Sequence, residues 1–173
     1  MPRIALDLNN ADDCRKVKGQ WRIGPGLVPG QANEGLKAQL LESPARLADY
    51  DDSGWELCTN IRKGISKGFT FAWYRITVEL PEQLNGVALS DYRVFFETNV
   101  DNYGEVWIDG KLDRSAGAIV GINAQQRVEV SAKAQAGAKH VIACLVANGP
   151  LAEPRGGVFM RYATLAFELS DRG

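Results

Sequence analysis

Two strands and a tight turn can be recognised in residues 92–112, YRVFFETNVDNYGEVWIDGKL. Apolar and polar residues alternate in 92–98 and again in 105–109, which is the period of a strand with one buried face. Asp109-Gly110 follows the second run and favours a two-residue hairpin, because both residues tolerate a positive φ. This stretch therefore predicts antiparallel β structure.

Further strand-like runs lie on both sides of this stretch. Residues 69–80 are apolar on both faces and then on one, and Pro81 ends the run because proline cannot donate to a ladder. Residues 127–130 alternate, 140–147 are nearly all apolar, and 158–169 form a long β-rich run. Short strands separated by turns about every 8–12 residues, without a βαβ pattern, predict an all-β fold, a two-sheet antiparallel β-sandwich or jelly roll.

The first 50 residues are interrupted by turn signals. Gly24-Pro25-Gly26 and Pro29-Gly30 are typical of loops, and only residues 31–42 have a helical composition. We expect residues 1–50 to be a turn-rich segment packed on the sandwich, so that residues 1–173 form a single domain. At about 150 residues per domain, the length of the chain agrees with one domain.

Composition and charge exclude several functions. The chain has 20 Lys and Arg against 21 Asp and Glu, a formal net charge of −1, so it has no strong positive field for nucleic acid or a membrane surface. The start, MPRIALDL, lacks the apolar centre of a signal peptide, and no apolar run approaches the ~20 residues that cross a bilayer. The cysteines Cys14, Cys58 and Cys144 show no disulfide or zinc spacing. We expect a cytoplasmic protein with free thiols and without nucleic-acid or membrane partners.

A family resemblance is carried by residues 73–75 (WYR), 94–97 and 100–110 (VDNYGEVWIDG). Together they resemble the sugar-binding domain of family-2 glycoside hydrolases, in which a W-Y-R strand precedes a D-x-x-x-x-V-W-x-N-G hairpin. A glycine-containing segment, an asparagine at a strand end and a double glycine follow in that family, as Gly117–Asn123, Asn148 and Gly156-Gly157-Val158-Phe159 do in this sequence. Asp109 stands where the family usually has Asn.

The resemblance covers about residues 50–170 and implies a galactose-binding-domain-like jelly roll. In the resembled family the catalytic carboxylates lie in a separate barrel domain. The resemblance therefore implies that this chain is not itself an enzyme.

Carbohydrate sites combine a flat aromatic ring, which covers the C–H face of a pyranose, with polar groups that bond its hydroxyls. Loops at one end of a sandwich can supply both. The ligand-binding residues that we expect are Trp55, Asp101, Asn102, Tyr103, Asn123, Asn148 and Arg155. Trp55 is the leading aromatic candidate, with a cap of the core as its alternative, and turn formation is the alternative for Asp101 and Asn102.

Structural roles are expected for several other polar and aromatic residues. Arg75 and Arg161 lie in apolar strands and require a carboxylate partner. His140, at a strand end, is expected to be structural, and no G-x-S-x-G or phosphate loop is present. We place Trp73, Tyr74 and Trp107 in the core.

No cofactor is expected, although a structural calcium ion remains an alternative. Asp49-x-Asp51-x-Ser53-Gly54 matches the first half of a calcium loop, but Asn60 replaces the bidentate Glu at its twelfth position. The stretch therefore favours an acidic turn.

Three functions remain open. The first is a non-catalytic carbohydrate-binding module for a mono- or oligosaccharide. The second is an interaction or accessory subunit on the same sandwich, which binds a partner enzyme or a second copy of itself. The third is a small enzyme that acts on glycosides, because paired carboxylates meet only in three dimensions.

Overall fold

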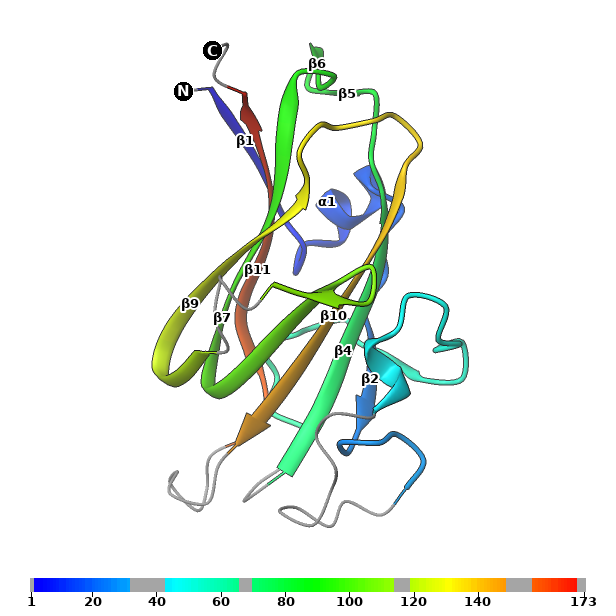
Figure 1. Ribbon diagram of the computed structural model, residues 1–173, viewed down its shortest axis with the longest axis vertical. Coiled ribbons are helices and arrows are strands. Elements are labelled where there is room, and N and C mark those ends of the chain that lie inside the picture. Colours follow the sequence, from blue (N-terminus) through cyan, green and yellow to red (C-terminus); the bar gives the residue numbers. More distant parts are fainter. Residues whose placement is uncertain (1, 32–42, 66–69, 114–118, 149–156, 171–173) are drawn as a thin grey trace.

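The computed structural model describes residues 2–31, 43–65, 70–113, 119–148 and 157–170, and for residues 101 and 119–124 it describes the backbone alone. The chain forms a two-layered antiparallel β-sandwich (Figure 1), as the alternating pattern predicts. The elements are β1 (Arg3–Asp7), α1 (Ala11–Lys16), β2 (Arg22–Pro25), the 3-10 helix η2 (Pro44–Arg46), β3 (Glu56–Leu57), β4 (Thr70–Glu79), β5 (Gln83–Leu84), β6 (Val87–Ala88), β7 (Tyr92–Ile108), β8 (Lys111–Leu112), β9 (Ile119–Ser131), β10 (Lys139–Asn148) and β11 (Met160–Leu169).

Strand β7 belongs to both layers. Its residues 92–100 pair with β11, which in turn pairs with β1, and we call this layer sheet I. Its residues 103–108 pair with β10, and the order continues through β4, β2 and β3, which we call sheet II. Strand β9 follows the other edge of β7, and the two strands bend together (Figure 1).

The bend in β7 depends on a close approach between Gly104 and Val100. A Cβ atom on Gly104 would lie 2.3 Å from Cγ2 of Val100, so no larger residue fits without a shift. The side-chain Nε2 of Gln126 in β9 donates to the Gly104 carbonyl at 2.7 Å. Asn102, beside the irregularity in the ladder, has a φ of 74°. The bend thus depends on the absence of a side chain at Gly104, the left-handed backbone of Asn102 and the buried side-chain amide of Gln126.

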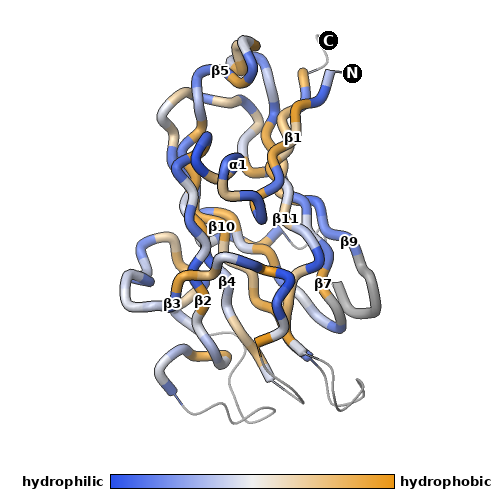
Figure 2. The backbone as a smooth tube through the Cα atoms, turned by 180° about the vertical axis from the view of Figure 1, so that it is seen from behind, coloured by the Kyte–Doolittle hydropathy of each residue, from blue (hydrophilic) through white to orange (hydrophobic). Residues whose placement is uncertain are grey.

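The main core lies between the two sheets. Alternate residues of β4 and β10 point into it, among them Tyr74, Ile76 and Ile142. The ring of Trp21 lies against Phe96 with the centroids 6.2 Å apart. Figure 2 shows hydrophobic stretches along the central strands, whereas α1 is hydrophilic.

A second apolar cluster lies on the outer face of sheet II. Phe71 and Trp73 of β4 point away from the main core and are buried, which confirms that the first half of this strand is covered on both faces. On β10 the alternate residues 143, 145 and 147 join the cluster. Residues 43–55, here called the strap, cover part of this face, and Ala45 of the strap is fully buried in the cluster.

Arg75 fastens the strap to sheet II. Its guanidinium is 2% exposed and donates to the carbonyls of Ala45 at 2.6 Å, Leu47 at 2.9 Å and Tyr50 at 3.3 Å. Its Nε donates to Oδ2 of Asp52 at 2.9 Å. The carboxylate partner expected for Arg75 is therefore Asp52.

The turn-rich description of residues 1–50 is corrected in part. Strand β1 pairs antiparallel with β11, so that Leu6 lies opposite Leu165, and β2 pairs with β4. Both strands are too short for a periodic pattern to stand out. The predicted helix of residues 31–42 falls almost entirely outside the described residues.

The predicted hairpin at Asp109-Gly110 is confirmed by φ angles of 50° and 76°. The Asp109 carboxylate accepts the backbone N–H of Val141 at 2.8 Å and lies 2.8 Å from Nδ1 of His140. His140 therefore has the structural role expected of it. Over the described ranges, no helix has both the length and the apolar character that a membrane span requires.

Candidate functional site

The predicted site residues do not all lie in loops. Asn102 and Tyr103 are part of β7, and both are partly exposed. Asn148 ends β10 and is 2% exposed. Positions 101 and 123 lie within β7 and β9, where the backbone alone is described, and Arg155 lies outside the described residues. The polar residues near the bend had suggested loops because they lack apolar alternation.

Trp55 and Tyr103 are brought to the same outer face of sheet II, where both pack against the second cluster. Trp55 lies across Gly24 of β2, so closely that a Cβ atom there would come within 2.6 Å of its ring. The ring centroid of Tyr50 is 5.4 Å from that of Trp55. Trp55 therefore covers the β2 end of the cluster, and Tyr103 lies at the β7 end.

Three successive outward-facing positions of β7 carry an aromatic residue, an acidic residue and a second aromatic residue. These are Tyr103, Glu105 and Trp107, here called the β7 column, and all three are partly exposed. The Tyr103 hydroxyl donates to Oε1 of Glu105, and Nε1 of Trp107 donates to Oε2 at 3.0 Å. Each carboxylate oxygen thus accepts one hydrogen bond from a neutral donor and keeps a further lone pair.

The surroundings of the β7 column are mostly apolar. Across the ladder, Trp107, Glu105 and Tyr103 lie opposite residues 143, 145 and 147 of β10, which are Ala, Leu and Ala. Arg46 of η2 lies over Trp107, with the guanidinium carbon 5.8 Å from the ring centroid. The column therefore presents two rings, a fixed carboxylate and a nearby cation.

The expected core position is confirmed for Trp73 and Tyr74, which are 1% and 0% exposed, and only in part for Trp107, which is half-buried against the second cluster. Trp107 points to the outer face of sheet II, where the second cluster covers it only in part. Sequence reasoning missed Glu105. The signal was present in the alternation of residues 103–107, which places their odd positions on one face.

Among the described carboxylates with a shifted pKa, none shifts upward as a general acid requires. A hydrogen bond from Ser53 lowers the pKa of Asp51, and one from Lys18 lowers the pKa of Glu79. For Asp13, burial raises the pKa, but hydrogen bonds from Lys16 and the Asp7 amide outweigh it. None of the three therefore resembles a catalytic acid.

The stretch that partly matches a calcium loop forms an acidic turn, in which carboxylate oxygens accept hydrogen bonds from the chain itself. Asp51 Oδ1 accepts the backbone N–H of Ser53 at 2.9 Å, and Asp52 pairs with Arg75. In the part of the chain that the structure describes, no three His, Cys, Asp or Glu side chains are grouped to hold a metal ion.

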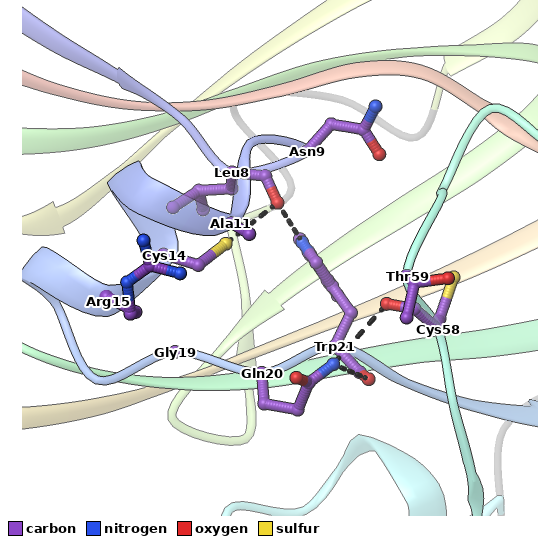
Figure 3. A pocket seen from close by; sticks show the side chains of 10 residues that line it. All are labelled: Leu8, Asn9, Ala11, Cys14, Arg15, Gly19, Gln20, Trp21, Cys58 and Thr59. Atoms are coloured by element: carbon purple, nitrogen blue, oxygen red, sulfur yellow. Dashed lines mark hydrogen bonds between the residues drawn. The ribbon is translucent and has the colours of Figure 1, made fainter.

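A separate pocket of about 230 Å³ lies between α1, the residues before β2 and the segment after β3 (Figure 3). Its walls are formed by Leu8, Asn9, Ala11, Cys14, Arg15, Gly19, Gln20, Trp21, Cys58 and Thr59. The Cys14 thiol and Trp21 Nε1 both donate to the Leu8 carbonyl, at 3.1 and 2.9 Å. Much of the polar lining is thus already hydrogen-bonded within the chain.

The two thiols in this pocket are expected to react slowly. Burial, followed by the carboxylates of Asp13 and Asp7, raises the pKa of Cys14 to about 11, and burial raises the pKa of Cys58. Because the thiolate is the nucleophile, alkylation by iodoacetamide at pH 8 should be at least tenfold slower than in the urea-unfolded chain, where a thiol pKa is about 8.5. The rate at Cys14 should rise as the pH approaches 11. Peptide mass spectrometry measures each site, and equal rates in the folded and unfolded chains would contradict the burial of these thiols.

Comparisons with known proteins identify solved structures that share this fold. No family model matches the chain, and no curated protein matches it significantly. Among solved structures, a *Bacteroides uniformis* beta-glucuronidase aligns with a TM-score of 0.62 at 16% identity, over 96% of this chain and 18% of that enzyme. A glycosyl hydrolase family 2 member from *Bacteroides cellulosilyticus* aligns with a TM-score of 0.60 at 14% identity, over 95% of this chain and 21% of that one. A *Faecalibacterium prausnitzii* beta-glucuronidase gives a TM-score of 0.62 at 13% identity, over 97% and 32%.

These identities establish the fold alone. The chain spans between 18% and 32% of the length of these three enzymes. The predicted all-β sandwich is thereby confirmed, and the resemblance seen in the sequence agrees with the same group of proteins. The chain has the fold of a β-sandwich portion of family-2 glycoside hydrolases.

Proposed function

We propose that the chain is a non-catalytic carbohydrate-binding domain that holds a mono- or oligosaccharide at the β7 column. The observation that carries this proposal is the hydrogen bonding of two partly exposed aromatic side chains to one carboxylate between them. Pyranose rings stack their C–H faces on such aromatic rings. The second lone pairs on Glu105 can accept two neighbouring hydroxyls of one sugar.

The rigid position of the β7 column and the share of the enzymes that this chain covers support a binding rather than a catalytic role. The β7 column lies on a rigid sheet, held by ladder bonds to β10 and by the bend at Gly104. A site on a strand keeps its side chains in fixed geometry. This chain covers only 18% to 32% of the matching enzymes, so their activities are not assigned to it.

Calorimetric titration with mono- and oligosaccharides at millimolar concentration tests the proposal. Trp107→Ala should weaken binding at least tenfold, because it removes a stacking surface and one donor to Glu105. Trp55→Ala is the matched control, since this ring also packs against the second cluster but lies at the β2 end. Thermal unfolding of both variants shows whether the fold is retained.

Each outcome of the titration has one meaning. Binding lost in the Trp107 variant and kept in the Trp55 variant supports the β7 column. The reverse result would move the site to the loop around Trp55. Absence of binding to every sugar tested would overturn the proposal.

An accessory role is a second candidate, favoured by one feature of the surface. Leu57 is 52% exposed on β3, the last strand in the order of sheet II. Light scattering after gel filtration should then show a stable dimer, or a complex with a partner enzyme, that Leu57→Ser disrupts. A monomer unaffected by that substitution would remove the support for this role.

A further inference from the structure

Glu105 differs from the other half-buried carboxylates of the described residues. Five others each have an Arg or Lys nitrogen within 4.0 Å, namely Asp13, Asp52, Glu79, Glu97 and Glu168. Within the described residues, Glu105 has no such cation and is held by the neutral donors of Tyr103 and Trp107. Among the described residues, its negative charge therefore has no ion-pair partner.

A partly desolvated carboxylate is unfavourable unless it is paired, and two neutral hydrogen bonds offset only part of that cost. The flanking rings also favour a positive charge, because the face of an aromatic ring is electronegative. Arg46 already places its guanidinium over Trp107. The column therefore has the features of a site for a cationic group.

No charged group of the described residues on β10, β4 or η2 forms an ion pair with Glu105. Strand β10 contributes only the apolar residues 143, 145 and 147 beside the column. Arg75 of β4 is buried and bound to Asp52. Arg46 of η2 lies over Trp107 and forms no ion pair with Glu105 within 4.0 Å in the described structure.

We propose that the sugar bound at the β7 column is an amino sugar whose protonated amine donates to Glu105. This inference rests on the proposed carbohydrate-binding function and narrows its ligand class. A 2-amino pyranose presents an ammonium next to a hydroxyl, and the two carboxylate oxygens can accept one hydrogen bond from each. N-acetylation removes the charge, and a sugar acid would place a second carboxylate beside Glu105, which is unfavourable.

The test compares glucosamine trimers with N-acetylglucosamine trimers and cellotriose by calorimetry, at a pH at which the amine is protonated. The glucosamine trimer should bind at least tenfold more tightly than the other two, and added salt should weaken its binding alone. Glu105→Gln keeps the shape of the side chain but removes its charge, and should abolish the preference for the glucosamine trimer. The control is Glu82→Gln, which replaces an exposed carboxylate just before β5 and should keep the preference.

Failure of the amino-sugar inference and failure of the proposed carbohydrate binding give different results. Equal affinities of the three trimers for the unmodified chain would overturn the amino-sugar inference and leave carbohydrate binding in place. A preference that survives in Glu105→Gln would also overturn it. Absence of binding to all three trimers and to the wider panel of sugars would overturn both proposals.

Discussion

Replacing Arg75 by Met should lower the free energy of unfolding by about 3–5 kcal/mol, the range found when one partner of a buried ion pair is removed. The substitution keeps an unbranched side chain but leaves the carbonyls of Ala45, Leu47 and Tyr50 without this donor. It also removes the close partner of Asp52. Urea unfolding followed by circular dichroism measures the loss, and limited proteolysis should show faster cleavage within the strap.

Two matched variants distinguish the effect of the Arg75 contacts on stability from the general effect of replacing an arginine. Arg93→Met removes an exposed guanidinium that pairs with Glu129, and should cost less than about 1 kcal/mol. Arg75→Lys keeps the charge but cannot reach all four acceptors, and should lie between the two. If Arg75→Met and Arg93→Met have equal effects, the strap is not fastened by Arg75.

Gly104→Ala should lower the free energy of unfolding by about 2–3 kcal/mol, near the upper part of the usual cost of overpacking. The new Cβ would lie 2.3 Å from Cγ2 of Val100, a branched side chain that is 2% exposed and has little room to move. Since the bend carries β7 from sheet I to sheet II, both layers should be affected. Urea unfolding measures the change.

A second substitution tests whether the contact with Val100 causes the loss of stability in Gly104→Ala. Val100→Ala removes the methyl group that clashes, so the double variant with Gly104→Ala should be less destabilised than the sum of the two single variants. Gly64→Ala is the control, because a Cβ there meets nothing within 4 Å. If the effects of Val100→Ala and Gly104→Ala on the free energy of unfolding simply add in the double variant, the contact with Val100 does not determine the cost of a larger residue at position 104.

The strands that could be predicted are those with a long apolar or alternating run. Residues 69–80 and 140–147 correspond to β4 and β10, and their apolar pattern reflects burial on the two faces of one sheet. The short strands β1 and β2 escaped prediction because their partners, β11 and β4, lie far along the chain. Local sequence does not reveal such pairing.

Strand β7 shows a different limit. Residues 92–98 and 105–109 suggested two strands joined by a loop, whereas the structure has one strand from Tyr92 to Ile108. Polar residues near 101 resemble a loop because they interrupt the alternation. In the sandwich they form the bend at which the strand changes sheets, and this role depends on partners in β9, β10 and β11.

The candidate site was predicted in part. Tyr103 was expected to bind a ligand and lies in the β7 column, whereas Glu105 was not considered and Trp107 was assigned to the core. The alternation shows that these three side chains share a face, but not which face the strap leaves open. That depends on where residues 43–55 pack, and Arg75 determines this through contacts some 25 to 30 positions away in sequence.

The most direct test of carbohydrate binding at the β7 column is a titration of tryptophan-labelled protein, followed through its indole N–H resonances. The chain has four tryptophans, so four signals are expected. Trp21 and Trp73 are 2% and 1% exposed and donate to the carbonyls of Leu8 and Leu27. The signal of Trp107 should shift with added oligosaccharide, while those of Trp21 and Trp73 stay in place. Shifts confined to Trp55 or Trp21, or no shift with any sugar, would contradict binding at this face.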